Sequence, residues 1–127
     1  MYSLLALKRK YKKRAKAVFM GRNRIVYDMG KYVVKIPLNE DGIADNDWEG
    51  STVWEDSPDH ITARTRAAWV DCKCHGVIPI LFAERVNFEA LAGVGYEALP
   101  EWAGSIDCGQ VGYTKKGKLV AYDFGIR

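Results

Sequence analysis

Long apolar runs and cysteines are both scarce in this chain of 127 residues. The longest apolar run near its start, Leu4 to Leu7, is too short for a signal peptide or a membrane span. The three cysteines are an odd number, and without an export signal we expect them to be reduced thiols. These two absences predict a cytoplasmic protein that is neither secreted nor inserted in a membrane.

The few cysteines leave one metal site open as an alternative. Cys72, Cys74 and His75 lie close together in the sequence, and Cys108 could complete a set of four zinc ligands. The spacing C-x-C-H is not one of the usual spacings of structural zinc sites. We therefore expect thiols in turns, with zinc as the alternative.

Acidic residues are almost missing from the first part of the chain. Residues 1–35 contain eleven Lys or Arg and one acid, whereas residues 36–127 contain eight Lys or Arg and fifteen acids. A basic block of this kind binds nucleic acid, anionic lipid or an acidic protein face, and the alternative is a solvated helix attracted to the acidic remainder. The block that we predict to contact a partner is Lys8, Arg9, Lys10, Lys12, Lys13, Arg14 and Lys16.

The composition is that of one globular domain, with 48% hydrophobic and 28% charged residues. Apolar residues at helical spacing after Ser3 predict a basic amphipathic helix over residues 1–18. Residues 39–47 are expected to form a loop, and helices are expected at 45–55 and 87–99. Runs rich in β-branched and aromatic residues predict strands, arranged mostly as hairpins, at 24–28, 31–38, 62–70, 77–83, 111–114 and 118–122. The predicted class is α+β, with an antiparallel sheet of five to six strands.

Two short sequences point to a particular chemistry. Residues 123–125 read D-F-G after an apolar strand, and residues 32–35 read Y-V-V-K. Both resemble elements of protein kinases, in which the lysine holds the phosphates of the nucleotide and the aspartate binds magnesium. The resemblance assigns these roles to Lys35 and Asp123, and it makes Glu49, fourteen residues after Lys35, the ion-pair partner of the lysine.

The resemblance continues through the rest of the chain. Residues 81–86, L-F-A-E-R-V, look like a kinase hinge, in which the main chain of Glu84 and Val86 would face adenine. Gln110 precedes Asp123 by thirteen residues, where kinases commonly place a metal-binding asparagine. The resemblance therefore implies ATP and magnesium as cofactors, with Gln110 and Asp123 as metal ligands.

The patterns G-x-x-R-x-V-Y-x-x-G and V-V-K-I-P resemble those of compact kinase-like proteins of tailed bacteriophages. The fold implied for residues 19–127 is a minimal kinase-like domain, with a kinase-like N-lobe and a vestigial C-lobe. A phage origin would place the protein in the host cytoplasm.

The chain also departs from the kinase pattern. The H-R-D catalytic loop and the G-x-G-x-x-G loop are missing, and Gln110 stands in place of an asparagine. The nearest candidate for the catalytic base is Asp107, for which a turn-capping carboxylate is the alternative. Because only two residues follow Gly125, we expect no activation segment and no peptide-binding helical lobe.

These departures favour a protein that acts by binding, as a pseudokinase-like inhibitor or regulator of a host protein. Whether this chain retains ATP and magnesium binding stays an open alternative. The first alternative is an active phosphotransferase that uses Lys35, Glu49 and Asp123. The second is nucleic-acid binding by the basic block, which lacks the accompanying signature of a known nucleic-acid-binding domain. Each site residue also has an ordinary structural alternative, such as a lysine or an acid at the surface of a strand.

Overall fold

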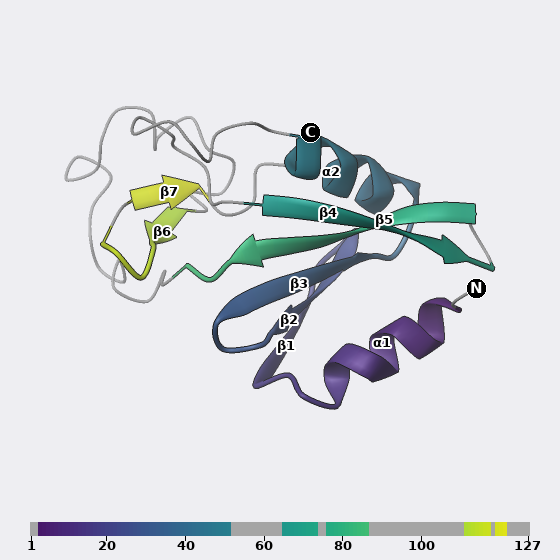
Figure 1. The fold of residues 1–127 in the computed structure, drawn as a ribbon, viewed down its shortest axis with the longest axis horizontal. Helices are drawn as coiled ribbons and strands as arrows, with labels where there is room; N and C mark the ends of the chain where they lie inside the picture. Colours follow the sequence, from purple (N-terminus) through teal and green to yellow (C-terminus); the bar gives the residue numbers. More distant parts are fainter. Residues whose placement is uncertain (1–2, 52–64, 74–75, 87–110, 118, 122–127) are drawn as a thin grey trace.

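The fold is a five-stranded antiparallel sheet with a helix on each face, together with a separate two-stranded hairpin (Figure 1). The computed structural model describes residues 3–51, 65–73, 76–86, 111–117 and 119–121. The order of strands in the large sheet is β1-β2-β3-β5-β4, and the α+β class predicted from the sequence is confirmed. The elements are α1 (Leu4–Lys12), β1 (Ala17–Met20), β2 (Arg24–Asp28), β3 (Tyr32–Pro37), α2 (Glu40–Ser51), β4 (Thr65–Cys72), β5 (Gly76–Glu84), β6 (Val111–Tyr113) and β7 (Leu119–Ala121).

The turn between β2 and β3 forms as the sequence predicts. Gly30 has a φ of 94°, a conformation that glycine adopts without the steric cost of a Cβ atom. The carboxylate of Asp28 accepts a hydrogen bond from the Gly30 N–H at 2.8 Å, and the Met29 N–H donates to the Tyr32 carbonyl at 2.9 Å. This turn sets the register in which Val26 lies opposite Lys35.

Helix α1 is shorter than the sequence predicts. It begins as expected, because the Ser3 hydroxyl accepts a hydrogen bond from the Ala6 N–H at 3.0 Å. It ends at Lys12, and residues 17–20 pair with β2 instead of continuing the helix. The prediction of one helix over residues 1–18 is therefore wrong beyond Lys12. Val18 is β-branched and Phe19 is aromatic, and both residue types favour an extended strand, which here pairs with β2.

Helix α2 begins earlier than expected, so the loop predicted at 39–47 is wrong. The Asn39 side chain accepts a hydrogen bond from the Gly42 N–H at 2.9 Å, which makes Asn39 the N-cap of the helix. Glu40 and Asp41 follow in the first turn, where the helix dipole favours negative charge. Gly42 suggested a loop because glycine weakens helices, but here the cap and the packing of the helix outweigh that cost.

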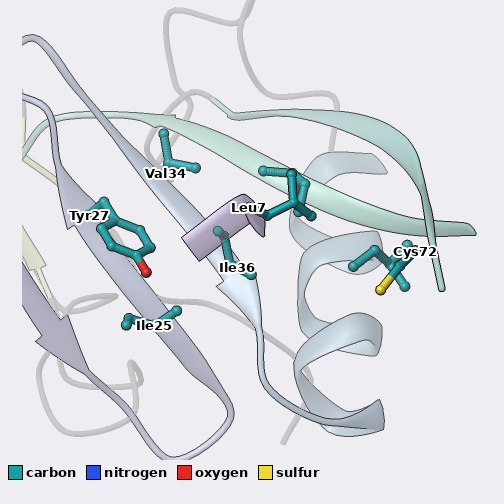
Figure 2. Close-up of a cluster of buried hydrophobic side chains, with 8 residues drawn as sticks. Leu7, Ile25, Tyr27, Val34, Ile36 and Cys72 are labelled. Carbon is teal, nitrogen blue, oxygen red and sulfur yellow. The ribbon is translucent and has the colours of Figure 1, made fainter. Parts of the chain in front are cut away.

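The main hydrophobic core lies between α1 and the sheet (Figure 2). Leu7 is the buried residue of α1, and it packs among side chains of β2, β3 and β5. Tyr11, one turn further along, contacts the rings of Tyr27 and Phe82, with ring centroids 6.2 and 6.3 Å away. Besides Leu7, the buried members of this core are Ile25, Tyr27, Val34, Ile36, Cys72, Ile78 and Ile80.

None of the helices in the described residues is long and apolar enough to cross a membrane.

The β4–β5 and β6–β7 hairpins form where the sequence predicts strands, and Gly76 and Gly117 adopt positive φ beside them. The helix predicted at 87–99 lies outside the described residues.

Candidate functional site

The candidate site is a cluster of buried charges on the face of the sheet opposite the main core. Successive side chains of a strand point to opposite faces, so Lys35 points away from the core that contains Val34 and Ile36. Helix α2 covers this second face. The ammonium nitrogen of Lys35 lies 3.2 Å from a carboxylate oxygen of Glu49 on α2, and both side chains are at least 95% buried. The proximity of these two residues, expected from the sequence, is therefore observed.

Polar residues and a glycine form the buried face of α2. Asp45, Asn46 and Glu49 are all at most 2% exposed, and the first two lie four and three residues before Glu49. Gly42 lies one turn before them, so close to β3 and the β1–β2 turn that an added Cβ would be 2.1 Å from the Asn23 carbonyl oxygen. The helix therefore approaches the sheet closely and presents a polar face to it.

Arg24 is a second buried cation on the same carboxylate. Its guanidinium forms a salt bridge with Glu49 and donates a hydrogen bond to the Asn46 side-chain oxygen at 3.1 Å. Arg24 is the first residue of β2, and its side chain is 6% exposed. Glu49 thus accepts hydrogen bonds from two cations that come from neighbouring strands.

Asn46 connects α2 to two strands at once. Its side-chain amide donates to the main-chain carbonyls of Lys35 on β3 and Pro79 on β5, each at 2.9 Å. Its oxygen accepts from Arg24, so the donors and the acceptor of the amide all have partners. This arrangement holds the helix against the sheet and keeps Glu49 in position beside Lys35.

Opposite charges meet inside the cluster. The two cations, Lys35 and Arg24, both pair with the buried carboxylate of Glu49, and Asp45 is a further buried acid on the same helix. Removing such charges from water is costly, and it is tolerated only when opposite charges and hydrogen bonds replace the lost hydration. A replacement that left one of the cations without its partner would therefore be strongly destabilising.

The predicted hinge residues lie next to this face. Val86 packs against Val120, which is fully buried and lies on β7, three residues before Asp123. Between Glu84 and Val86, the two residues predicted to form a hinge, the Arg85 guanidinium Nε lies 3.1 and 3.2 Å from the two carboxylate oxygens of Asp28. These contacts join the end of β5 to β2 and to the β6–β7 hairpin.

Three of the predicted site residues, Asp107, Gln110 and Asp123, lie outside the described residues. The same holds for three of the four zinc candidates, whereas the fourth, Cys72, is buried in the hydrophobic core. Within the part of the chain that the structure describes, no group of three or more His, Cys, Asp or Glu side chains could hold a metal ion.

The basic block is mostly exposed. Lys8 is half-buried on α1, while the remaining basic residues of the block extend into solvent. Lys10 also lies over the Tyr11 ring, with its nitrogen 5.5 Å from the ring centroid. The exposed members of the block are Arg9, Lys10, Lys12, Lys13, Arg14 and Lys16.

Sequence reasoning missed Arg24 and Asn46 as members of the site. A signal for Asn46 was present, because it lies three residues before Glu49 and therefore shares its helix face. A signal for Arg24 was its position in an apolar strand, where alternate residues face inward. Polar residues at helical spacing usually form a solvated face, and here they form the buried one.

Comparisons with known proteins identify no relative: no family model, no curated protein and no solved structure matches the chain.

Proposed function

We propose that this chain is a kinase-like protein that binds a nucleotide on the Lys35 face of the sheet and acts by binding a protein partner. The observation that carries the proposal is the buried ion pair between Lys35 and Glu49. Kinases hold the α- and β-phosphates with a lysine on their third strand, and a glutamate on the following helix positions that lysine. Here the lysine is on β3 and the glutamate is on α2, the next element.

The neighbours of Lys35 support an adenine position beside it. Val26 lies opposite Lys35 in the β2–β3 register, and Val33 lies opposite Ala83 in the β3–β5 register. Directly opposed residues share a face, so these small apolar side chains are on the Lys35 face. Val26 and Val33 are half-buried, which leaves apolar surface for a flat aromatic ring.

The phosphates would lie beside the Lys35 ammonium, which supplies a positive charge to their oxygens. Because Arg24 also pairs with Glu49, the carboxylate does not depend on Lys35 alone for charge compensation. Lys35 can therefore turn toward a phosphate without leaving Glu49 as an isolated buried charge. Asp123 and Gln110 are the residues that the kinase resemblance assigns to magnesium.

A binding role is favoured over phosphoryl transfer by the sequence around position 107. Transfer to a hydroxyl uses a positioned carboxylate in the H-R-D loop, and this chain has no such motif. Nucleotide binding in this proposal stabilises the fold that the partner recognises. Transfer of labelled γ-phosphate by the wild-type chain, lost in Lys35→Met, would instead make the chain a phosphotransferase.

A thermal-shift titration of the full chain with ATP and Mg²⁺ tests the proposal. Lys35→Met should remain folded, because the other contacts of α2 persist. Arg24 still pairs with Glu49, and Asn46 still bonds to the main-chain carbonyls of residues 35 and 79. The matched control is Lys31→Met, which removes an exposed lysine from the same hairpin.

A ligand at a hundred times its Kd stabilises the native state by about 2.7 kcal/mol, so the wild type and Lys31→Met should melt several degrees higher with ATP. The melting temperature of Lys35→Met should not respond. An equal response in Lys35→Met, or no response in the wild type, would contradict nucleotide binding on this face.

A further inference from the structure

Strand β1 is an open edge of the sheet with apolar side chains on both of its faces. It stands at one end of the strand order β1-β2-β3-β5-β4, so within the described residues only one side of it is paired. Val18, Phe19 and Met20 are 42%, 50% and 69% exposed. Val18 and Met20 lie opposite Tyr27 and Ile25 on the core face, whereas Phe19 is on the Lys35 face.

The hydrogen-bond pattern shows which main-chain groups of β1 point outward. The Gly21 N–H donates to the Arg24 carbonyl at 2.9 Å, which makes these two residues a hydrogen-bonded pair. Hydrogen-bonded and non-bonded pairs alternate along an antiparallel ladder, so Phe19 bonds to β2 while the N–H and C=O groups of Val18 and Met20 face away from it. An extended peptide can bind to such groups as an added strand.

Positive charge stands at both ends of this edge. Lys13, Arg14 and Lys16 precede β1 and Arg22 follows it, and all four side chains are exposed. Asp28, the one acid among residues 1–35, is engaged by Arg85. Among the described residues, none of the ion pairs involves the basic side chains that flank the strand.

We infer that β1 is the docking site for an extended segment of a partner protein, a short apolar strand with acidic residues at both ends. Strand pairing would satisfy the outward main-chain groups of Val18 and Met20. The acidic residues would meet Lys13, Arg14 and Lys16 at one end and Arg22 at the other. The inference deepens the partner-binding role proposed above and specifies the surface and the chemistry of the partner.

Two other occupants fit the edge less well. Antiparallel pairing of β1 with β1 of a second copy would place Lys16 of one chain near Arg22 of the other, and like charges opposite one another are unfavourable. An anionic membrane would attract the basic residues, but open main-chain groups of a strand are not accommodated in hydrocarbon. A protein segment satisfies both the charges and the main chain.

Fluorescence anisotropy with a designed peptide tests the inference without any nucleotide, so failure of ATP binding and failure of peptide docking are distinguishable. The labelled peptide has four alternating Val and Thr residues between two Glu at each end. Val18→Pro removes one outward N–H and is tolerated on an edge strand, whereas the matched variant Val18→Thr keeps that N–H. Circular dichroism and thermal melting verify that both variants fold.

The expected result is that Val18→Thr binds the peptide within about 3-fold of the wild type and that Val18→Pro binds at least about 10-fold more weakly, since one lost hydrogen bond is worth roughly 1.4 kcal/mol. The double variant Lys13→Gln, Arg14→Gln should weaken binding and reduce its salt dependence. The double variant Lys115→Gln, Lys116→Gln neutralises exposed lysines on the β6–β7 turn, and it should change neither the affinity for the peptide nor its salt dependence.

Equal binding by Val18→Pro and Val18→Thr would overturn the inference, as would equal binding of a peptide with Lys in place of Glu. It would also be overturned by dimerisation in light scattering that Val18→Pro abolishes, because a second copy would then be the occupant. Tighter binding to single-stranded DNA or to phosphatidylglycerol vesicles than to the peptide would assign the surface to those ligands instead.

Discussion

The ammonium of Lys35 and the carboxylate of Glu49 are 3.2 Å apart, although they belong to different elements and are separated by fourteen residues in the sequence. The pair is buried, and Arg24 and Asn46 hold it from two further directions. This arrangement makes Glu49 the centre of the buried cluster. The stability of the fold and the proposed nucleotide site therefore depend on the same carboxylate.

Replacing that carboxylate should be costly. Glu49→Gln leaves Arg24 and Lys35 buried beside a neutral group, and breaking a buried ion pair by removing one partner costs about 3–5 kcal/mol. The free energy of unfolding, measured with urea, should fall by that amount. The control Asp47→Asn, which changes an exposed acid of the same helix, should stay within about 0.5 kcal/mol of the wild type. A loss below about 1 kcal/mol for Glu49→Gln would show that the pair does not stabilise the fold.

Truncating Asn46 should loosen α2 from the sheet. Asn46→Ala leaves the carbonyls of Lys35 and Pro79 without this donor, and a buried polar group that loses its partner costs about 1–3 kcal/mol. We expect the free energy of unfolding to fall and the amide protons of α2 to exchange faster. Unchanged exchange rates in α2 would contradict the role of Asn46 as the link between helix and strands.

For the substitution Gly42→Ala, helix propensity and packing predict opposite changes in the stability of the protein. Alanine is favoured over glycine inside a helix by about 1 kcal/mol, so propensity alone predicts that Gly42→Ala stabilises the protein. The added Cβ would lie 2.1 Å from the Asn23 carbonyl oxygen, a distance that forces the backbone to move. We therefore expect a lower melting temperature for Gly42→Ala. The exposed Ala44→Gly calibrates propensity on the same helix, and a stabilised Gly42→Ala would mean that α2 is not closely packed there.

Stability should depend on pH in the alkaline range through Tyr27. Burial raises the pKa of Tyr27 above its ordinary value of 10.0, because the charged phenolate would lose its hydration. The unfolded chain therefore releases this proton first, so the contribution to stability is complete below pH 10 and is lost as the pH rises through the folded-state pKa. The urea midpoint should fall more steeply above pH 10 for the wild type than for Tyr27→Phe. If the urea midpoints of the two proteins fell in parallel above pH 10, the Tyr27 hydroxyl would not be buried.

Local patterns predicted much of the fold. The β2–β3 hairpin follows from β-branched residues around a glycine that tolerates positive φ, and the Ser3 cap follows from its hydroxyl. The errors occurred where tertiary pairing decided between helix and strand, as at Val18, and where a glycine obscured the helix that Asn39 begins. The strand at Val18 depends on pairing with Tyr27, which the helical periodicity of the first residues does not reveal. The Asn39 cap is a local signal, and the expected cost of Gly42 in a helix masked it.

The sequence predicted some of the site residues and missed others. The pairing of Lys35 with Glu49 was expected through the kinase resemblance, and the ion pair is present. Arg24 and Asn46 were missed, because their spacing shows which face they share but not whether that face meets a buried carboxylate or water.

The proposal that the Lys35 ammonium faces a bound nucleotide's phosphates is tested most directly by covalent labelling. An acyl-phosphate derivative of ATP transfers its acyl group to an amine beside the phosphates, and mass spectrometry of the full chain identifies which lysine is modified. We expect modification of Lys35 that excess ATP suppresses, while the exposed lysines of the basic block react slowly and without protection. Labelling confined to that block and unaffected by ATP, with Lys35 unmodified, would contradict it.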